Sequence, residues 1–445
     1  MHRNQQEKVK TGFWSLNLDK ILSTLFYLLT LFLPVQIGKH FWPNFSFVFG
    51  LRLDYLSPTI YLTDIFIVLI FVFSIPKFKS FFLKIDKKKV VFFCLFLLSL
   101  FVGIINAKNS LAGFYGVVKF LEYSFLTLFV IAYFRNFNKS ILFFCFLAGI
   151  IFESCLAFFQ SLNQGSIGGL FYYFGERAFN AQTPGIANAS INGQLFLRPY
   201  ATFSHPNVLA GFLVIAMLYL CLFFKNQKKY LLTGIIIGTA TLFSTLSRTA
   251  IFLWAICLIV LFGIPLVKKY KNRFSNMKLV IGVISAAVLI VVVYLFFQNS
   301  FFLQRFFLTK ITDESLTQRV MLAQQSFTMF LRSPIFGIGI NNFFNNLIFP
   351  NSQLTVLLIQ PVHNIFLLVL SETGLIGFFL FIYLFYKCLK CLSHAKSTKE
   401  KKYLFMLIFS VIFLGSFDHY FLTIQQGQIM LSLILGTAFS YGKLK

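Results

Sequence analysis

Acidic residues are scarce in this sequence. Its 445 residues include 13 Asp and Glu against 39 Lys and Arg, which gives a formal net charge of +26. Outside the apolar runs, the acids form no D-x-D or other spaced pair that could hold a catalytic Mg²⁺ or Mn²⁺. They also form no carboxylate pair suited to two-step glycoside hydrolysis. We therefore expect a site with no metal and no cofactor.

Several common catalytic motifs and a disulfide framework are missing as well. The sequence holds no G-x-S-x-G, H-E-x-x-H or P-loop pattern. Of the seven cysteines, the first five lie within apolar runs, so no disulfide framework is expected. Cys388 and Cys391 form a C-x-x-C, but no second pair accompanies them, and we expect no metal site there.

Apolar residues dominate what is present. Hydrophobic side chains make up 58% of the chain, 64 residues are Phe, and the mean hydropathy is +0.79. A water-soluble domain has no place for so much apolar surface. Runs of about 20 apolar residues recur along the whole length. We therefore expect an all-α integral membrane protein, with residues 1–445 forming a single polytopic domain.

The sequence contains about twelve expected transmembrane helices. Of the 39 Lys and Arg, 28 fall in every second segment between these spans, and therefore on one side of the membrane, as the positive-inside rule requires. The high positive charge therefore indicates membrane topology and no nucleic-acid partner, and it places both termini in the cytoplasm. The spans start near Ile21, Pro58, Val90, Gly116, Ile141, Asn207, Leu231, Thr249, Leu279, Asn364, Tyr403 and Gln425.

Two outer loops are long enough to carry short surface helices of their own. The first covers residues 160–206 and the second covers residues 298–362. In the second, Ser315 and Gln318 make an S-x-x-Q capping box before a helical pattern that ends at Ser333-Pro334. We expect this helix to lie along the membrane surface. Its predicted apolar face consists of Leu316, Val320, Ala323, Phe327, Phe330 and Leu331.

The basic residues expected outside the membrane are mostly arginine. Ten Lys and Arg are expected on the outer side and seven of them are Arg, whereas the cytoplasmic segments use mainly Lys. Topology alone is satisfied by either residue, but the planar fork of Arg binds phosphate oxygens with two hydrogen bonds. The split favours an anionic ligand outside, with loop packing by arginine as the alternative.

A His-Asn pair, His363 and Asn364, stands where the second loop meets an apolar helix. An imidazole with a pKa of about 6.5 can accept a proton near neutral pH. Beside outer arginines, it suits a lipid-linked diphosphate: the arginines neutralise the leaving group and the histidine activates a hydroxyl. The alternative is a polar residue that only marks the membrane boundary.

The stretch from His363 fits H-N-x9-G-x-x-G, with Gly374 and Gly377 in the glycine positions. In this pattern the chain resembles the O-antigen ligase family, which shares a membrane domain with O-antigen polymerases. Three more blocks resemble this family, and the resemblance covers residues 198–380. They are RPYATFSHPN from Arg198, SRT from Ser247, and GIGINNF from Gly337. Phe378 departs from the ligase pattern, which usually has Thr or Val after the second Gly.

The resemblance implies a metal-independent, inverting glycosyltransferase in the bacterial plasma (inner) membrane, with its site facing the periplasm. Its donor would be a glycan on undecaprenyl diphosphate, and membrane lipid would surround it. The acceptor would be lipid A-core for a ligase, another lipid-linked repeat for a polymerase, or a protein side chain for related oligosaccharyltransferases. The implied base is His363, and the implied diphosphate ligands are Arg248, Arg319 and Arg198.

The remaining implied residues support the site. His205 and Asn207 would shape the start of the sixth span, next to Arg198. Gly337 and Gly339 belong to a turn whose backbone amides can face a substrate. The supporting set is Asn364, His205, Asn207, Gly337, Gly339, Gly374 and Gly377.

A twelve-helix secondary transporter or flippase is the alternative from a different class. Asp64, Glu153 and Glu372 are acids within apolar runs that could form an ion relay. Such transporters carry internal repeats. No correspondence is visible between the two halves of this chain, and its polar residues gather at the outer surface.

Overall fold

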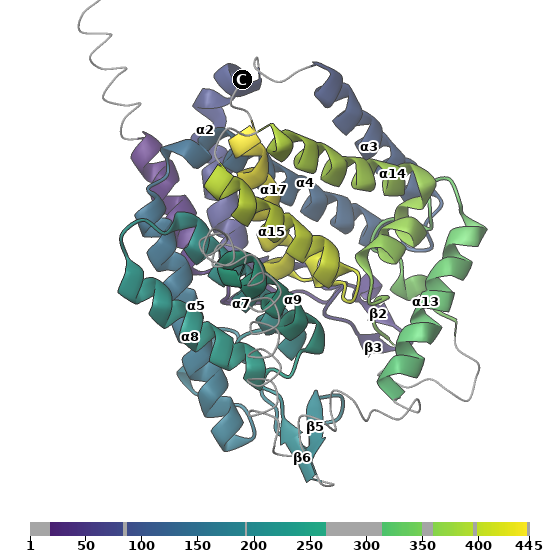
Figure 1. The fold of residues 1–445 in the computed structure, drawn as a ribbon. Helices are drawn as coiled ribbons and strands as arrows, with labels where there is room; N and C mark the ends of the chain where they lie inside the picture. The colour runs from purple at the N-terminus through teal and green to yellow at the C-terminus, as the bar shows by residue number, and fades with distance from the viewer. Residues whose placement is uncertain are drawn as a thin grey trace, which may run out of the picture.

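The protein is a bundle of α-helices with three short antiparallel strand pairs in its loops (Figure 1). The computed structural model describes residues 18–82, 87–191, 194–263, 314–348, 359–394 and 398–442. Its helices are residues 18–31, α2 (Leu62–Phe82), α3 (Lys87–Ile105), α4 (Ser110–Tyr133), α5 (Lys139–Asn163), α6 (Leu170–Tyr173), α7 (Pro206–Phe223), α8 (Lys228–Ser244), α9 (Arg248–Leu258), α13 (Glu314–Arg332), α14 (Ile365–Ser393), α15 (Thr398–Gly415), α16 (Tyr420–Thr423) and α17 (Gln425–Gly442).

The strand pairs all belong to loops between helices. In the loop before α2, β1 (Gly38–His40) pairs with β4 (Thr59–Tyr61), and β2 (Phe47–Val48) pairs with β3 (Leu51–Arg52). In the first long loop, β5 (Asn188–Ile191) pairs with β6 (Gln194–Leu197) at one edge of the molecule (Figure 1).

Each expected span that falls within the described residues coincides with a helix, and the span near Leu279 lies outside them. By length and composition, four helical segments of the described chain can cross a membrane: Ser110–Asn136, Lys139–Asn163, Pro206–Phe223 and Ile365–Ser393. The all-helical prediction is confirmed in this coarser form. The number of twelve spans and the cytoplasmic termini stay predictions.

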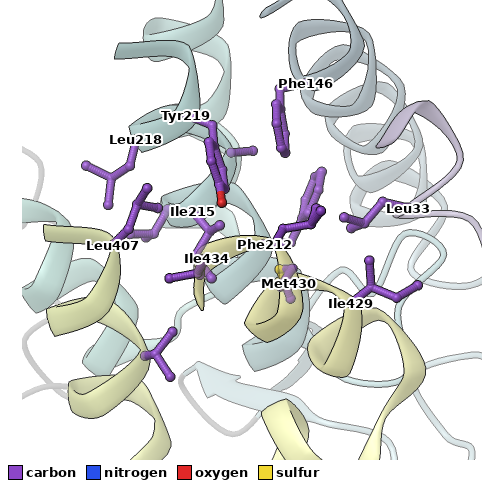
Figure 2. Close-up of a cluster of buried hydrophobic side chains, with 14 of the residues drawn as sticks. Leu33, Phe146, Phe212, Ile215, Leu218, Tyr219, Leu407, Ile429, Met430 and Ile434 are labelled. Atoms are coloured by element: carbon purple, nitrogen blue, oxygen red, sulfur yellow. The ribbon is translucent and has the colours of Figure 1, made fainter. Parts of the chain in front are cut away.

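Helix α7 forms the centre of the bundle. It is apolar all round, which is the pattern of a helix surrounded by protein, and every residue from Val208 to Phe223 is buried. Figure 2 shows Phe212 and Tyr219 of α7 among side chains from α5, α15 and α17. The rings of Tyr219 and Phe146 stack at 4.6 Å between centroids. Within a bilayer such rings stabilise the bundle by close van der Waals packing, so α7 is held by contacts on all sides.

Helix α14 is broken at Gly374, which adopts φ 63° and ψ −166°. This region of conformational space is essentially restricted to glycine. A Cβ atom there would stand 2.4 Å from the backbone carbon and oxygen of Ile335. The break therefore lets the segment after α13 dock directly on the α14 backbone, where Leu375 N–H donates to the Pro334 carbonyl at 2.8 Å.

The Gly-rich turn after α13 is held by Glu372. The Gly339 N–H donates to the Glu372 carbonyl at 3.0 Å, and the Phe343 N–H donates to its carboxylate at 3.2 Å. The Ile338 N–H donates to the Ser371 carbonyl. The amides of Ile338, Gly339 and Phe343 are therefore already bonded to α14, and the Gly337 N–H donates to the Ser333 carbonyl, so these four amides are not free to bind a substrate.

Helix α13 stands at one edge of the molecule and packs on α14 (Figure 1). It ends at Arg332, as Ser333-Pro334 predicts. One expectation fails: the helix already includes Glu314, so Ser315 is no N-cap. The helix packs on the protein through Leu322, Ser326 and Met329, whereas Val320, Phe327 and Leu331 of the predicted apolar face are exposed. That this face lies on the membrane surface stays a prediction.

Replacement of Gly374 by Ala should destabilise the fold strongly, because the new methyl group collides with backbone atoms of Ile335 that cannot move aside. The matched control is Gly168→Ala, since Gly168 also has a positive φ of 73° but open space around it. We expect the control to cost only the conformational strain of about 1–3 kcal/mol. Thermal unfolding in detergent measures both; equal losses would show that the docking at the break is unimportant.

Candidate functional site

A cavity of about 2250 Å³ runs along α14. At the loop end, its wall includes His205, His363, Asp418 and His419. Along the helices the wall is largely apolar and is formed by side chains of α3, α4, α14 and α17, such as Phe96, Phe120, Leu384 and Leu435. The cavity thus joins a polar head to an apolar groove.

Asn364 fixes the position of His363. It is the N-cap of α14, and its side-chain oxygen accepts hydrogen bonds from the N–H groups of Phe366 and Leu367 at 2.8 and 3.0 Å. Its amide nitrogen donates to the Ser416 carbonyl at 3.0 Å. One side chain therefore caps the helix and ties it to the end of α15, two residues before Asp418.

Asp418 and His419 complete the polar end of the cavity. The ligating atoms of His363, Asp418 and His419 lie within 4.8 Å of one another. The His363 and His419 rings meet edge to face with centroids 5.2 Å apart. On its other side, His419 meets the ring of Tyr55 at 5.7 Å, which itself stacks on Phe344. These aromatic rings hold His419 in place.

Asn207 links the arginine of the RPYATFSHPN block to this cluster. Its side-chain oxygen accepts a hydrogen bond from Arg198 Nη2 at 2.9 Å, and its nitrogen donates to Asp418 Oδ2 at 3.2 Å. Arg198 is buried, and its Nε donates to the Thr245 carbonyl at 2.7 Å. Arg198 therefore stabilises the cluster indirectly, through its hydrogen bond to Asn207.

His205 caps the start of α7. Its Nδ1 accepts the Asn207 N–H at 3.1 Å, so the ring proton of the neutral form lies on Nε2. This capping role agrees with the expectation that His205 shapes the start of the sixth span.

Burial and neighbouring charges shift the pKa values of the histidines and the carboxylate in this cluster. Burial lowers the pKa of His205 and His419 to about 3, and it lowers the pKa of His363 below the usual 6.5. Burial alone would raise the pKa of Asp418, but the neighbouring imidazoles and Arg319 outweigh this and lower it to about 2. At neutral pH the cluster thus holds three neutral imidazoles around one carboxylate.

Among the predicted arginines, Arg319 acts on His363 and His419, whereas Arg198 acts more strongly than Arg319 on His205. It lies in the first half of α13, and its positive charge acts on His363, Asp418 and His419. Arg248 begins α9 directly after the N-cap Ser247. Neither is among the described residues that line the cavity, whereas Arg177, which forms an exposed ion pair with Asp54 at 3.1 Å, is.

The four predicted glycines pack around the α14 break instead of forming the cavity wall. A Cβ on Gly337 would meet the Glu372 backbone at 2.3 Å, and one on Gly339 would meet the Gly103 carbonyl at 3.0 Å. Gly377 is buried against Thr373. We find none of Gly337, Gly339, Gly374 and Gly377 among the described lining residues.

Sequence reasoning missed Asp418 and His419 as partners of His363. The signal was present, since an Asp-His pair in a short turn between two apolar spans is unusual. The separation of more than fifty residues from His363 concealed the contact.

Residues 233–382 match the family described as O-antigen ligase. This segment is similar to O-antigen ligases. It contains Arg248, Arg319, His363 and the α14 break, and it confirms the resemblance seen in the motifs. The Arg198–Asn207 block lies before the matched residues. A comparison with curated proteins finds no match.

The match to O-antigen ligases and the apolar helices together indicate an integral membrane enzyme of the ligase or polymerase type, acting on polysaccharide or lipid-linked glycan. The acids considered for a transporter relay each have a partner in the fold. Asp64 pairs with Lys119 at 2.8 Å, Glu153 accepts from Thr202, and Glu372 holds the turn after α13.

Asn207→Ala should destabilise the protein by about 1.5–3 kcal/mol, the usual contribution of hydrogen bonds to charged groups, because Arg198 and Asp418 each lose one partner. The matched control is Asn163→Ala, which removes one exposed hydrogen bond to the Ser166 carbonyl. Thermal unfolding of both variants in the same detergent gives the comparison. A loss in Asn207→Ala no larger than in the control would show that the Asn207 bridge does not hold the cluster.

Proposed function

We propose that the chain transfers a glycan from undecaprenyl diphosphate to an acceptor hydroxyl of lipid A-core, on the outer face of the bacterial inner membrane. The observation that carries this proposal is the placement of His363. In a segment that matches O-antigen ligases, it stands at the head of the cavity with a carboxylate beside it.

His363 acts as the general base. At neutral pH its imidazole is uncharged, because burial lowers its pKa, so it is ready to accept a proton. As the acceptor oxygen attacks the anomeric carbon, its proton passes to His363 and the bond to the diphosphate oxygen breaks. The bonding electrons leave with the diphosphate. Asp418 then stabilises the imidazolium that has formed.

This single displacement inverts the anomeric carbon and requires no metal. The leaving diphosphate carries the developing negative charge, so positive side chains are the groups that accelerate its departure. Arg319 supplies such a charge close to His363, and Arg248 supplies another from the start of α9. Arg198 contributes indirectly, since it holds Asn207 and through it Asp418.

The apolar part of the cavity suits the polyprenyl chain of the donor. Phe93, Phe96 and Phe120 line it from α3 and α4, and Leu435 and Phe439 line it from α17. A lipid tail in this groove would place its diphosphate toward the polar head of the cavity.

The acceptor distinguishes two enzymes with the same domain. A polymerase would transfer the glycan to a second lipid-linked repeat in place of lipid A-core. Incubation of the purified chain with the donor and each acceptor in turn identifies which product forms. Translocation of the lipid without glycan transfer would instead indicate a transporter or flippase.

His363→Ala should reduce glycan transfer by ~10²–10⁴-fold, the usual cost of losing a general base, while the donor lipid still binds. His205→Ala should cost less, because His205 caps α7 and accepts no proton in the reaction. Radiolabelled glycan transfer at matched protein level measures both variants. If His205→Ala abolishes transfer and His363→Ala does not, the base is misassigned; if both variants transfer normally, the mechanism is wrong.

Arg248→Lys and Arg319→Lys should rescue transfer poorly, because Lys offers a point charge without the guanidinium fork. If each contact contributes about 1.5–3 kcal/mol, the Ala variants should lose on the order of 10- to 100-fold in rate. Arg332→Lys on the exposed last turn of α13 is the control. Normal turnover with both Lys substitutions combined would favour a packing role for these arginines.

A further inference from the structure

The ring of His419 lies beside Asp418. Its Nδ1 lies 2.6 Å from the Thr423 hydroxyl oxygen, and that hydroxyl lies 3.2 Å from the His419 carbonyl. When the Thr423 hydroxyl donates to this carbonyl, its oxygen accepts from Nδ1–H, and Nε2 carries no proton in the neutral ring. Nε2 lies 3.9 Å from Asp418 Oδ1, which is beyond hydrogen-bond distance.

His363 adds a second imidazole nitrogen to the same space. Its Nδ1 is buried and has no hydrogen-bond partner among the described residues. The carboxylate oxygens of Asp418 each accept one hydrogen bond, from the His419 N–H and from Asn207, and each keeps a further lone pair. A bound cation would give these nitrogens and the carboxylate a common partner.

We propose that His363, Asp418 and His419 form a binding site for Zn²⁺, and that the ion inhibits glycan transfer by occupying His363. Two imidazoles and one carboxylate are a common three-ligand set for Zn²⁺, with the fourth position left open. Ligand atoms around a tetrahedral Zn²⁺ lie roughly 3.4 Å apart, given bonds of about 2.0–2.2 Å. The three side chains, within 4.8 Å of one another, need to approach by only about 1 Å.

The surroundings orient the ligands as a metal site requires. Thr423 fixes the tautomer of His419, and Asn207 holds the carboxylate of Asp418; such outer contacts set ligand direction in known sites. Arg319 opposes the ion, because its positive charge acts on all three ligands. Removal of that charge should therefore tighten Zn²⁺ binding, whereas removal of a ligand should abolish it.

The inhibitory part of this proposal rests on His363 being the base of the proposed function. A lone pair bound to Zn²⁺ cannot accept a proton from the acceptor hydroxyl. Transfer should then proceed in the presence of a chelator and slow when Zn²⁺ is added. The binding part stands independently of any activity.

Zn²⁺ binding to the purified full-length chain in detergent can be measured by competition with a chromophoric chelator. Co²⁺ absorption serves as a second readout. We expect the wild-type chain to bind one equivalent of Zn²⁺ tightly. We expect His419→Gln and Asp418→Asn to lose this equivalent. Thr423→Val should weaken binding on the order of 10–100-fold, as loss of an outer contact does. Arg319→Gln should strengthen it, a result that misfolding would not produce.

Two control variants separate this site from other metal ligands in the chain. His40→Gln removes a histidine whose ring contacts Ser57 and Thr59, and Cys391→Ser breaks the C-x-x-C pair. Both should keep the full equivalent, and Co²⁺ should show no thiolate absorption. Full Zn²⁺ binding in His419→Gln, or loss in Cys391→Ser, would overturn the assignment.

Activity then distinguishes failure of the metal site from failure of the proposed function. If Zn²⁺ does not bind while His363→Ala loses transfer, the metal site is wrong and the base stands. If Zn²⁺ binds at these residues and His363→Ala still transfers, the base is wrong. If Zn²⁺ binds there and wild-type transfer does not slow, the inhibitory role is wrong.

Discussion

The amide side chain of Asn364 is the constraint on which the site depends. It caps α14 with its oxygen, and its nitrogen donates to the carbonyl of Ser416, directly after α15. Because His363 precedes it and Asp418 follows Ser416 by two residues, one side chain sets the relative position of His363 and Asp418. The apolar bundle around α7 supports both segments. Without the Asn364 bridge, the segment that carries His363 and the segment that carries Asp418 would lose this fixed relative position.

Burial gives the cluster its chemical character. Exposed histidines beside a carboxylate would gain protons as the pH falls through their usual range. Here desolvation outweighs the attraction of Asp418 and keeps the imidazoles neutral. The carboxylate stays ionised, since Arg319 and hydrogen bonds from Asn207 and the His419 N–H stabilise its charge. The same neutrality that prepares a base also prepares a metal ligand, so both proposals draw on one property of the site.

Much of the fold could be predicted from the sequence, because long apolar runs indicate membrane helices. The H-N-x9-G-x-x-G pattern also pointed to His363 and Gly374, but it did not predict the break at Gly374, which the chain around Ile335 occupies. Contacts between distant residues could not be predicted, because no periodicity links Asp418 to His363, or Asn207 to Arg198. The face of α13 that packs on protein could not be predicted either, because apolar residues can face lipid as well as protein.

The break at Gly374 also has a mechanical consequence. A continuous helix transmits bending along its whole length, whereas a helix interrupted by an extended glycine does so poorly. The short piece of α14 before the break is clamped by the turn that Glu372 holds, and the longer piece after it lines the apolar groove. The two pieces are therefore not one stiff rod, and a tilt of the longer piece can change the apolar groove without an equal displacement of His363.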